Sequence, residues 1–237
     1  AREISCRSVN ASDMADGIIR FAAGLAKKSL LANSCGAMAD MLLLPDSSAT
    51  DPSLLTQNIQ VLSSRPASAL WLGMLFYTLQ IYLDFSAYSD MAIGIGRMLG
   101  FIYKENFDYP YLSASITEFW RRWHMSLGAF FRDYVYIPLG GNRCSRWRWL
   151  FNILVVWFLT GFWHGAEWNF VIWGIYFAVF LIFEKYVLKN VMDKIPSIIR
   201  YIAVMTVVVI SFVIFNAEHL SEIGIFIKSM FGLNGLS

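Results

Sequence analysis

The chain has 237 residues, of which 57% are hydrophobic and only 15% are charged. This composition excludes an ordinary soluble domain and indicates an integral membrane protein with an all-α, multi-pass fold. The formal net charge is only +2, and we expect no nucleic-acid partner.

The first third of the chain predicts one helix between polar segments. Residues 1–16 are polar, lack the apolar core of a signal peptide, and contain a helix start at Ser12-Asp13. Residues 17–44 are mostly apolar but are interrupted by Lys27-Lys28, a pair typical of a membrane interface. This pattern suits a helix at the membrane surface, or one inside a bundle. Residues 45–66, rich in Ser, Asp, Pro and Thr, predict an aqueous loop.

The next apolar stretch contains a group of polar residues. Residues 66–83 carry no charge and are long enough to span a bilayer, and apolar character continues to residue 100. Two helices, or one long broken helix, fit this stretch. Its polar island comprises Asp84, Ser86, Tyr88, Ser89 and Asp90. Buried carboxylates need partners, and we expect a structural network with Arg97, Arg121 or Arg122.

The remaining elements alternate between loops and apolar segments. Residues 101–111 predict a loop and residues 138–142 a turn. Between them, residues 115–136 are too charged to cross lipid, so we expect an amphipathic helix that is interfacial or buried in protein. The three apolar helices expected after the turn cover residues 147–163, 169–188 and 198–215.

The charge distribution predicts the sidedness. Basic residues mark the cytoplasmic side, and they concentrate in one segment at Arg121, Arg122, Arg132, Arg143, Arg146 and Arg148. The basic loop at residues 184–200 should lie on the same side. From Arg148 to His164 is about 24 Å of helix at 1.5 Å per residue, against a hydrocarbon core of roughly 30 Å. His164 should therefore lie at the floor of a pocket that opens away from the cytoplasm.

His164 is the first candidate for chemistry. An imidazole in apolar sequence is either a functional group facing a cavity or a hydrogen-bonded histidine near a helix end. As a general base it could take a proton from a hydroxyl group. Gly161 and Gly165 would let another backbone or a ligand approach closely. Trp163 and Trp168 are either pocket walls or interfacial anchors.

A second candidate group surrounds His124. Arg121 and Arg122 could bind donor phosphates through bidentate hydrogen bonds, or they could serve only anionic lipid and topology. His124 either lines the path of a donor or pairs with a carboxylate such as Glu118. The cysteines Cys6, Cys35 and Cys144 follow no metal-ligand or redox spacing, so we expect free thiols and no metal site.

Four motifs in this chain resemble those of the membrane-bound O-acyltransferases. They are DFSAYSDMAIG at residues 84–94, FWRRWHMSL at 119–127, FRDY at 131–134 and FWHG at 162–165. A fifth, YIPLGGNR at residues 136–143, is closer to the alginate O-acetyltransferase branch than to the D-alanyl transfer branch. The resemblance runs from about Asp16 to Phe231.

The resemblance implies an enzyme that moves an acyl group from a cytoplasmic thioester to a hydroxyl on the other side of the bacterial inner membrane. The family's invariant histidine corresponds to His164, and its second histidine corresponds to His124. The donor, acetyl-CoA or an acyl carrier, is a substrate, with no permanently bound cofactor. Membrane lipid, periplasmic acetyl-transferring proteins and an exported polysaccharide are the implied partners.

Family members also have helices before the equivalent of Ala1 and more sequence after the equivalent of Ser237. We therefore expect residues 1–237 to be a single membrane domain, a fragment forming the C-terminal part of the family's core. An apolar groove between residues 66–100 and 147–183 should be exposed, with the polar island poorly covered.

Two other classes of function fit the residues alone. A transporter or channel would use Asp84, Asp90 and His164 as a polar pathway; inverted repeats would favour it, and we find none. A non-catalytic membrane scaffold is the third hypothesis.

Overall fold

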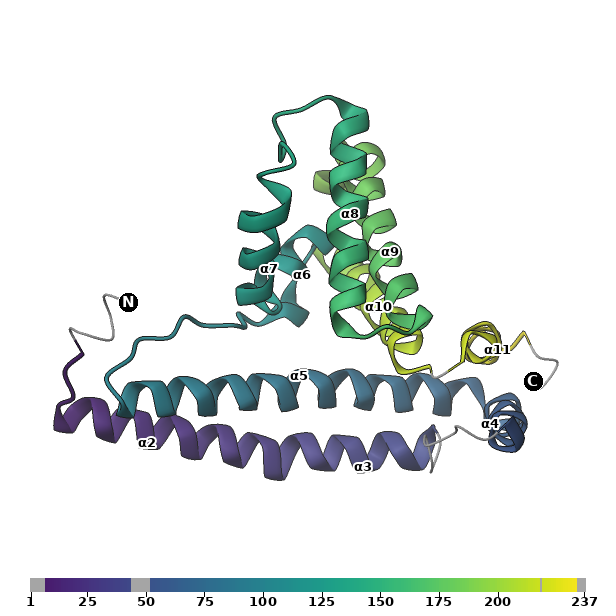
Figure 1. The fold of residues 1–237 in the computed structure, drawn as a ribbon. Helices are drawn as coiled ribbons and strands as arrows, with labels where there is room; N and C mark the ends of the chain where they lie inside the picture. Colours follow the sequence, from purple (N-terminus) through teal and green to yellow (C-terminus); the bar gives the residue numbers. More distant parts are fainter. Residues whose placement is uncertain (1–6, 44–51, 218, 234–237) are drawn as a thin grey trace.

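The computed structural model describes residues 7–43, 52–217 and 219–233, so Cys6 lies outside the described residues. Within these ranges every regular element is helical, as the sequence predicts. The helices form two parts. One is a long antiparallel pair, and the other is a bundle that stands across it (Figure 1).

The long pair joins the N-terminal segment to the helix of the polar island. Helix α2 (Ala11–Ala26) continues through a π-helical turn η1 (Lys27–Ala32) into α3 (Asn33–Leu42), and this rod packs along α5 (Ala67–Met98). A Cβ atom on Gly17 would lie 2.7 Å from the carbonyl oxygen of Gly94. Small residues thus let the two backbones approach closely. Helix α5 is one unbroken helix, not two helices or a broken one.

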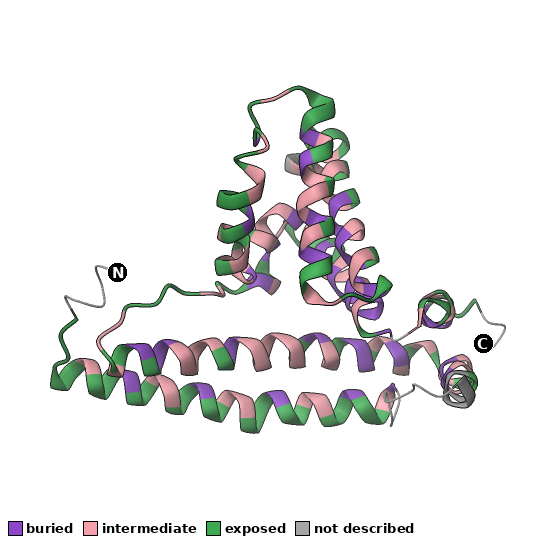
Figure 2. Ribbon diagram, viewed as in Figure 1, coloured by how far each residue is buried: buried purple, intermediate pink, exposed green. Residues whose placement is uncertain are grey.

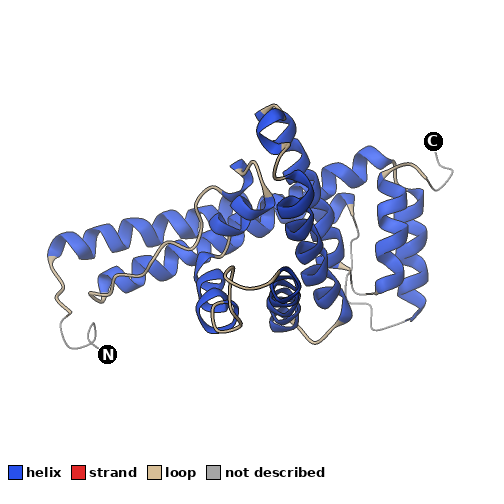
Figure 3. Cartoon of the chain, turned by 90° about the horizontal axis from the view of Figure 1, so that it is seen from above, coloured by secondary structure: helices blue, strands red, loops and turns tan. Residues whose placement is uncertain are grey.

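Residues 52–64 do not form the predicted loop. They form helix α4 (Pro52–Ser64), which packs against the C-terminal helix α11 (Leu220–Met230). Proline at the first helical position is compatible with a helix because its missing N–H would have no acceptor there. Residues 44–51 of the expected loop lie outside the described residues. Seen from above, α4 and α11 lie at the opposite end of the molecule from the start of α2 (Figure 3).

The bundle contains the three apolar helices expected from the sequence. They are α8 (Arg146–His164), α9 (Trp168–Phe183), extended by a π-helical turn η4 (Glu184–Leu188), and α10 (Ser197–Asn216). A Cβ on Gly174 would lie 2.2 Å from the carbonyl oxygen of Trp157, so glycine sets the close approach of α9 to α8.

Two helices in the described part of the chain have the length and apolar composition to cross a membrane. They cover Trp168–Leu188 and Ser197–Asn216. The sequence suggests about five such helices, and this number is too high by that measure. The reason is that α5 carries Asp84 and Asp90, while α8 begins with two arginines, Arg146 and Arg148.

The start of α8 and the end of α9 lie together, as predicted for two segments on one side. The Lys185 ammonium lies 3.5 Å from the centroid of the Trp149 ring, and the Arg146 guanidinium lies 4.5 Å from that of Tyr186. Such cation–π contacts are typical of basic side chains beside aromatic faces. The basic segment before α8 and the basic loop after α9 therefore share one end of the bundle.

Residues 115–136 do not form one amphipathic helix. They form α6 (Ile116–Arg122), α7 (Met125–Phe131) and a π-helical turn η3 (Arg132–Tyr136). The break falls at Trp123, which is extended, and at His124, whose φ of 44° is left-handed. This left-handed conformation costs a residue with a Cβ about 1–2 kcal/mol, so surrounding contacts must hold it.

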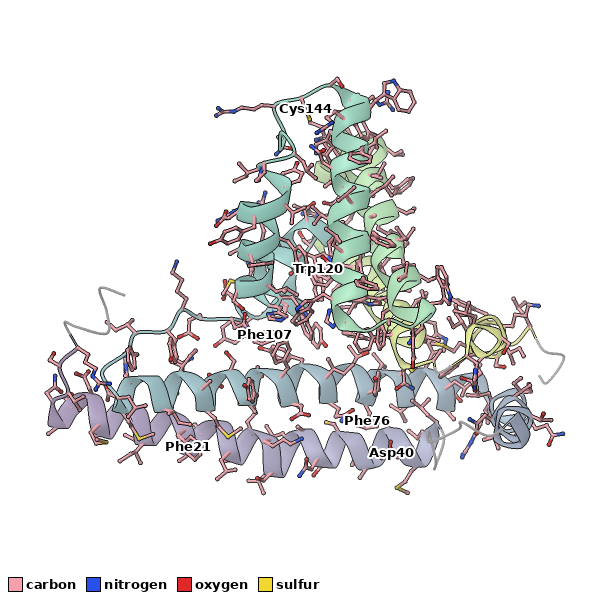
Figure 4. The ribbon with its side chains drawn as sticks, viewed as in Figure 1. Phe21, Asp40, Phe76, Phe107, Trp120 and Cys144 are labelled. Carbon is pink, nitrogen blue, oxygen red and sulfur yellow. The ribbon has the colours of Figure 1, made fainter. Side chains whose placement is uncertain are left out.

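An aromatic core fixes these short helices against the bundle. Trp120 on α6 lies with its ring centroid 4.6 Å from that of Trp157 on α8 and 4.8 Å from that of Phe177 on α9. Buried residues concentrate where α6, α8, α9 and α10 meet (Figure 2). Trp120 points toward α8 at this junction (Figure 4). The position of His124, just after α6, is thus tied to the bundle.

Candidate active site

His164 is the last residue of α8 and lies among aromatic rings. Its ring centroid lies 5.0 Å from those of Trp163 and Trp173 and 5.3 Å from that of Phe215. The helix ends there because Gly165 is extended and the chain turns into α9. The imidazole is half-buried in an apolar setting, which suits a neutral ring that exchanges a proton with one reacting group.

The glycines around His164 admit protein and not a ligand. A Cβ on Gly161 would lie 2.3 Å from the carbonyl oxygen of Phe170, and one on Gly165 would lie 2.5 Å from the Phe170 ring. The close approach predicted for this segment is therefore that of the α9 backbone. It fixes the last turn of α8, and with it His164, against α9.

His124 is held by a loop residue and not by a carboxylate. Its Nδ1 lies 3.2 Å from Asn106 Oδ1 and 3.4 Å from Ser126 Oγ. Asn106 Oδ1 also accepts from the Ser126 N–H (3.1 Å), and the Met125 N–H donates to the Asn106 carbonyl (2.9 Å). These bonds hold the left-handed turn at His124.

Of the two alternatives for His124, the pairing with Glu118 is wrong. Glu118 accepts from the Ala114 N–H (2.8 Å) and pairs with Arg122 (2.8 Å), so its carboxylate closes the first turn of α6. Burial, and then the neighbouring His164, lower the pKa of His124 to about 4. His124 is therefore neutral at pH 7.

The two histidines meet across one tryptophan. The Trp163 ring centroid lies 6.0 Å from that of His124 and 5.0 Å from that of His164. His124 also packs edge-on against Phe85 of α5, at 4.7 Å between centroids. Two residues 40 positions apart in the sequence thus share one aromatic environment, between the bundle and the long pair.

A cavity of about 610 Å³ opens beside His124. Its walls come from α6, α7, α8 and the end of α9, and they include Thr117, Trp120, Arg121, Arg132 and Thr160. His164 is not among its lining residues, so the prediction that His164 lies at the floor of a pocket stays a prediction.

The arginines at this cavity differ in their partners. Arg121 makes no ion pair with any carboxylate among the side chains that the structure describes. Arg122 is bound to Glu118 and donates to the Asp108 carbonyl (3.3 Å). Arg132 pairs with Asp133. Of the two arginines predicted to bind a donor phosphate, only Arg121 lines the cavity with its charge uncompensated.

The polar island is a structural network, but its partners are not the predicted ones. Asp90 pairs with Arg20 (2.9 Å) and with Lys27, and Asp84 pairs with Lys28 (2.7 Å). Lys27 and Lys28 thus neutralise carboxylates of the island, and their place at a membrane interface stays a prediction. Helix α2 and η1 supply the cations because they pack directly on α5. The expectation that the island would be poorly covered is corrected accordingly for Asp90.

Asn106 is the site residue that the sequence analysis missed. The signal was its residue type, because asparagine in a loop readily bonds to nearby backbone groups. Next to it, Phe107 lies between the break before α7 and helix α5 (Figure 4).

Among the described residues, Cys35 and Cys144 are free thiols, and no group of His, Cys, Asp and Glu is arranged to hold a metal ion.

Comparison with known proteins identifies the family. Residues 52–221 match the model of the membrane-bound O-acyltransferase family. The chain belongs to this family. Chains similar to it include the probable alginate O-acetylases AlgI of Azotobacter vinelandii (42% identical over 87% of this chain and 38% of the relative) and of Pseudomonas aeruginosa (39% over 95% and 40%).

A third relative carries a name that refers to peptidoglycan and not to alginate. The peptidoglycan O-acetyltransferase of Helicobacter pylori is 34% identical over 97% of this chain and 41% of its own length. The chain therefore spans about two fifths of the length of these relatives. The match to the family model confirms the resemblance that the sequence motifs indicated.

Proposed function

We propose that this chain is the core of a multi-pass inner-membrane enzyme that transfers an acyl group, acetyl by preference, from a thioester to hydroxyl groups of a cell-envelope polysaccharide. The names of the relatives support the reaction class and a glycan acceptor. The similar teichoic acid D-alanyltransferase of Bacillus subtilis aligns with only 48% of this chain. That difference favours the O-acetylating branch.

The observation that carries the proposal is that His124 and His164 both pack against the ring of Trp163. One imidazole lines a cavity with an uncompensated arginine, and the other sits in an aromatic cage. The cavity beside His124 would receive the thioester, with Arg121 bound to a donor phosphate. Arg122 has no role in this proposal because Glu118 already holds it.

The reaction needs one proton acceptor and no redox partner. The acceptor hydroxyl oxygen attacks the thioester carbonyl carbon while neutral His164 takes the hydroxyl proton. The tetrahedral intermediate then expels the thiolate, the C–S bond breaks, and the proton passes to the sulfur. The products are an ester and a free thiol. Periplasmic partner proteins would carry or receive the acyl group on the far side.

The test is acyl transfer by the full-length protein in proteoliposomes. His164→Ala should lower the rate by about 10² to 10⁴, the usual contribution of a general base, while the thermal midpoint changes little. His124→Ala should raise the KM for the donor. An unchanged rate of acyl transfer by His164→Ala would contradict the proposal.

The same samples separate the other functions. A transporter would show solute flux that depends on Asp84 or Asp90, without ester formation. Both carboxylates are ion-paired in the structure, which favours a structural role. A scaffold would show neither activity.

A further inference from the structure

A second cavity lies at the basic end of the bundle, far along α9 and α10 from His164. It has a volume of about 230 Å³ and lies between the start of α6, the end of α9 and the start of α10. Its walls are apolar, with side chains that include Phe180, Phe183, Leu188, Ile195 and Val204. Arg200 and Glu184 are its charged members.

The Arg200 guanidinium has a buried N–H donor that lacks a hydrogen-bond acceptor. Its Nε is buried and has no hydrogen-bond partner, and its Nη2 makes one contact of 3.4 Å with Ser197 Oγ. It forms no ion pair with any carboxylate whose side chain the structure describes. A buried guanidinium N–H without an acceptor is costly, so this side chain is suited to an anionic ligand.

Glu184 does not supply that acceptor. Its carboxylate accepts from the N–H groups of Ile116 (2.6 Å) and Thr117 (3.2 Å), at the start of α6. Its negative charge is thus bound to the first turn of α6, and it forms no ion pair with Arg200. The carboxylate still lines the cavity, so an anion here must bind on the Arg200 side.

The surroundings match a lipid and not a soluble anion. Ile198, Ile199 and Ile202 of α10 are exposed beside the cavity, so the surface around it is apolar. Lys189 and Lys194 lie exposed in the adjoining loop. The side chain of Pro196 cannot cap α10, and the Pro196 carbonyl already accepts from the N–H groups of Ile199 (3.0 Å) and Arg200 (3.2 Å). Basic groups above an apolar slot are complementary to a phosphate above an acyl chain.

We propose that this cavity binds an anionic membrane phospholipid, with one acyl chain between α9 and α10 and the phosphate on Arg200. The site is separate from the acyl-transfer site and does not depend on the proposed reaction. Because Ser115 and Ile116 form part of its wall, a bound lipid would also support the start of α6, which leads to Arg121.

The experiment is a lipid titration of the full-length protein in detergent, followed by native mass spectrometry. Dioleoylphosphatidylglycerol should bind more tightly than dioleoylphosphatidylcholine. Arg200→Gln should weaken phosphatidylglycerol binding by about tenfold or more, the effect of losing a hydrogen bond to a charged group. Arg143→Gln, which removes an exposed arginine outside the cavity, is the control and should bind as the wild type does.

A second variant keeps the test decisive if Arg200→Gln folds poorly. Ala203→Phe would place a ring in the apolar slot and should lower the binding of both lipids. Equal binding of the two lipids, or wild-type binding by both variants, would overturn the proposal. Displacement of phosphatidylglycerol by acetyl-CoA would also overturn the proposal, because it would assign the cavity to the donor. A cavity filled by other segments of the full-length chain would overturn it as well.

Discussion

The substitution Gly161→Ala tests whether the contact between α8 and α9 positions His164. The added Cβ would lie 2.3 Å from the Phe170 carbonyl oxygen and 3.0 Å from its carbonyl carbon. Ordinary contact begins near 3.4 Å, so the helices must separate by about 1 Å. The obstacle is backbone, which cannot rotate away as a flexible side chain can.

The expected cost has two parts. Overpacking of a close contact destabilises by about 1–3 kcal/mol. His164 lies three residues further along α8, so its ring shifts relative to Trp173 and Phe215, and a misplacement of about 1 Å can lower a rate by about 10²-fold. We expect Gly161→Ala to lose both thermal stability and most acyl transfer.

The assay compares this variant with Gly224→Ala in the full-length protein, by thermal unfolding and by acyl transfer. Gly224 lies on α11, where an added Cβ meets no atom within 4 Å. Alanine there should be neutral or stabilise by up to about 1 kcal/mol. If Gly161→Ala matched Gly224→Ala in both stability and transfer, the reasoning about the α8–α9 contact would be refuted.

Three further predictions, tested with four substitutions, concern the rest of the site. Asp90→Asn should destabilise by about 1–3 kcal/mol, because Lys27 loses its carboxylate partner and Arg20 keeps only Glu105. Asp84→Asn removes a more exposed single pair and should cost about 1 kcal/mol or less. Chemical unfolding measures both costs, and equal values would contradict the assigned network. The pKa of His124 is about 4 in the folded protein against 6.5 in the unfolded chain, so its contribution to stability is present above pH 6.5 and is lost as the pH falls toward 4. The thermal midpoint of His124→Gln should therefore depend less on pH in this window. A pH dependence equal to that of the wild type would argue against burial of the neutral ring. Asn106→Ala removes the acceptor of the Ser126 N–H and should lower transfer with little change in donor KM, whereas a change confined to KM would place Asn106 in donor binding.

The sequence predicts the apolar helices well because their signal is local. A run of apolar residues bounded by Arg148 and His164 is a helix in any membrane protein, and α8, α9 and α10 match their predicted ranges closely. The same reasoning does not find the partners of Lys27-Lys28, because the carboxylates that bind this pair lie about 60 residues away on α5. Partners across helices follow from packing, which one sequence does not display.

The candidate site divides in the same way. The identities of His124 and His164 follow from the motifs, but their meeting at Trp163 does not. The amphipathic pattern of residues 115–136 predicts one helix, since periodicity does not report a turn held by a distant loop. Asn106 makes that turn possible through bonds that cross about 20 residues of sequence.

The left-handed backbone at His124 lowers the stability of the fold, whereas the imidazole at the same residue serves the candidate site. Glycine adopts this conformation without the steric cost that a Cβ brings, so a chain selected for stability alone would favour glycine there. His124→Gly should therefore unfold at a higher temperature than His124→Ala, although both lack the imidazole. The difference between these two variants measures the strain that the wild-type backbone accepts in order to hold a ring beside the cavity. Engineering this protein for greater stability should thus leave residue 124 unchanged and seek its gains elsewhere in the fold.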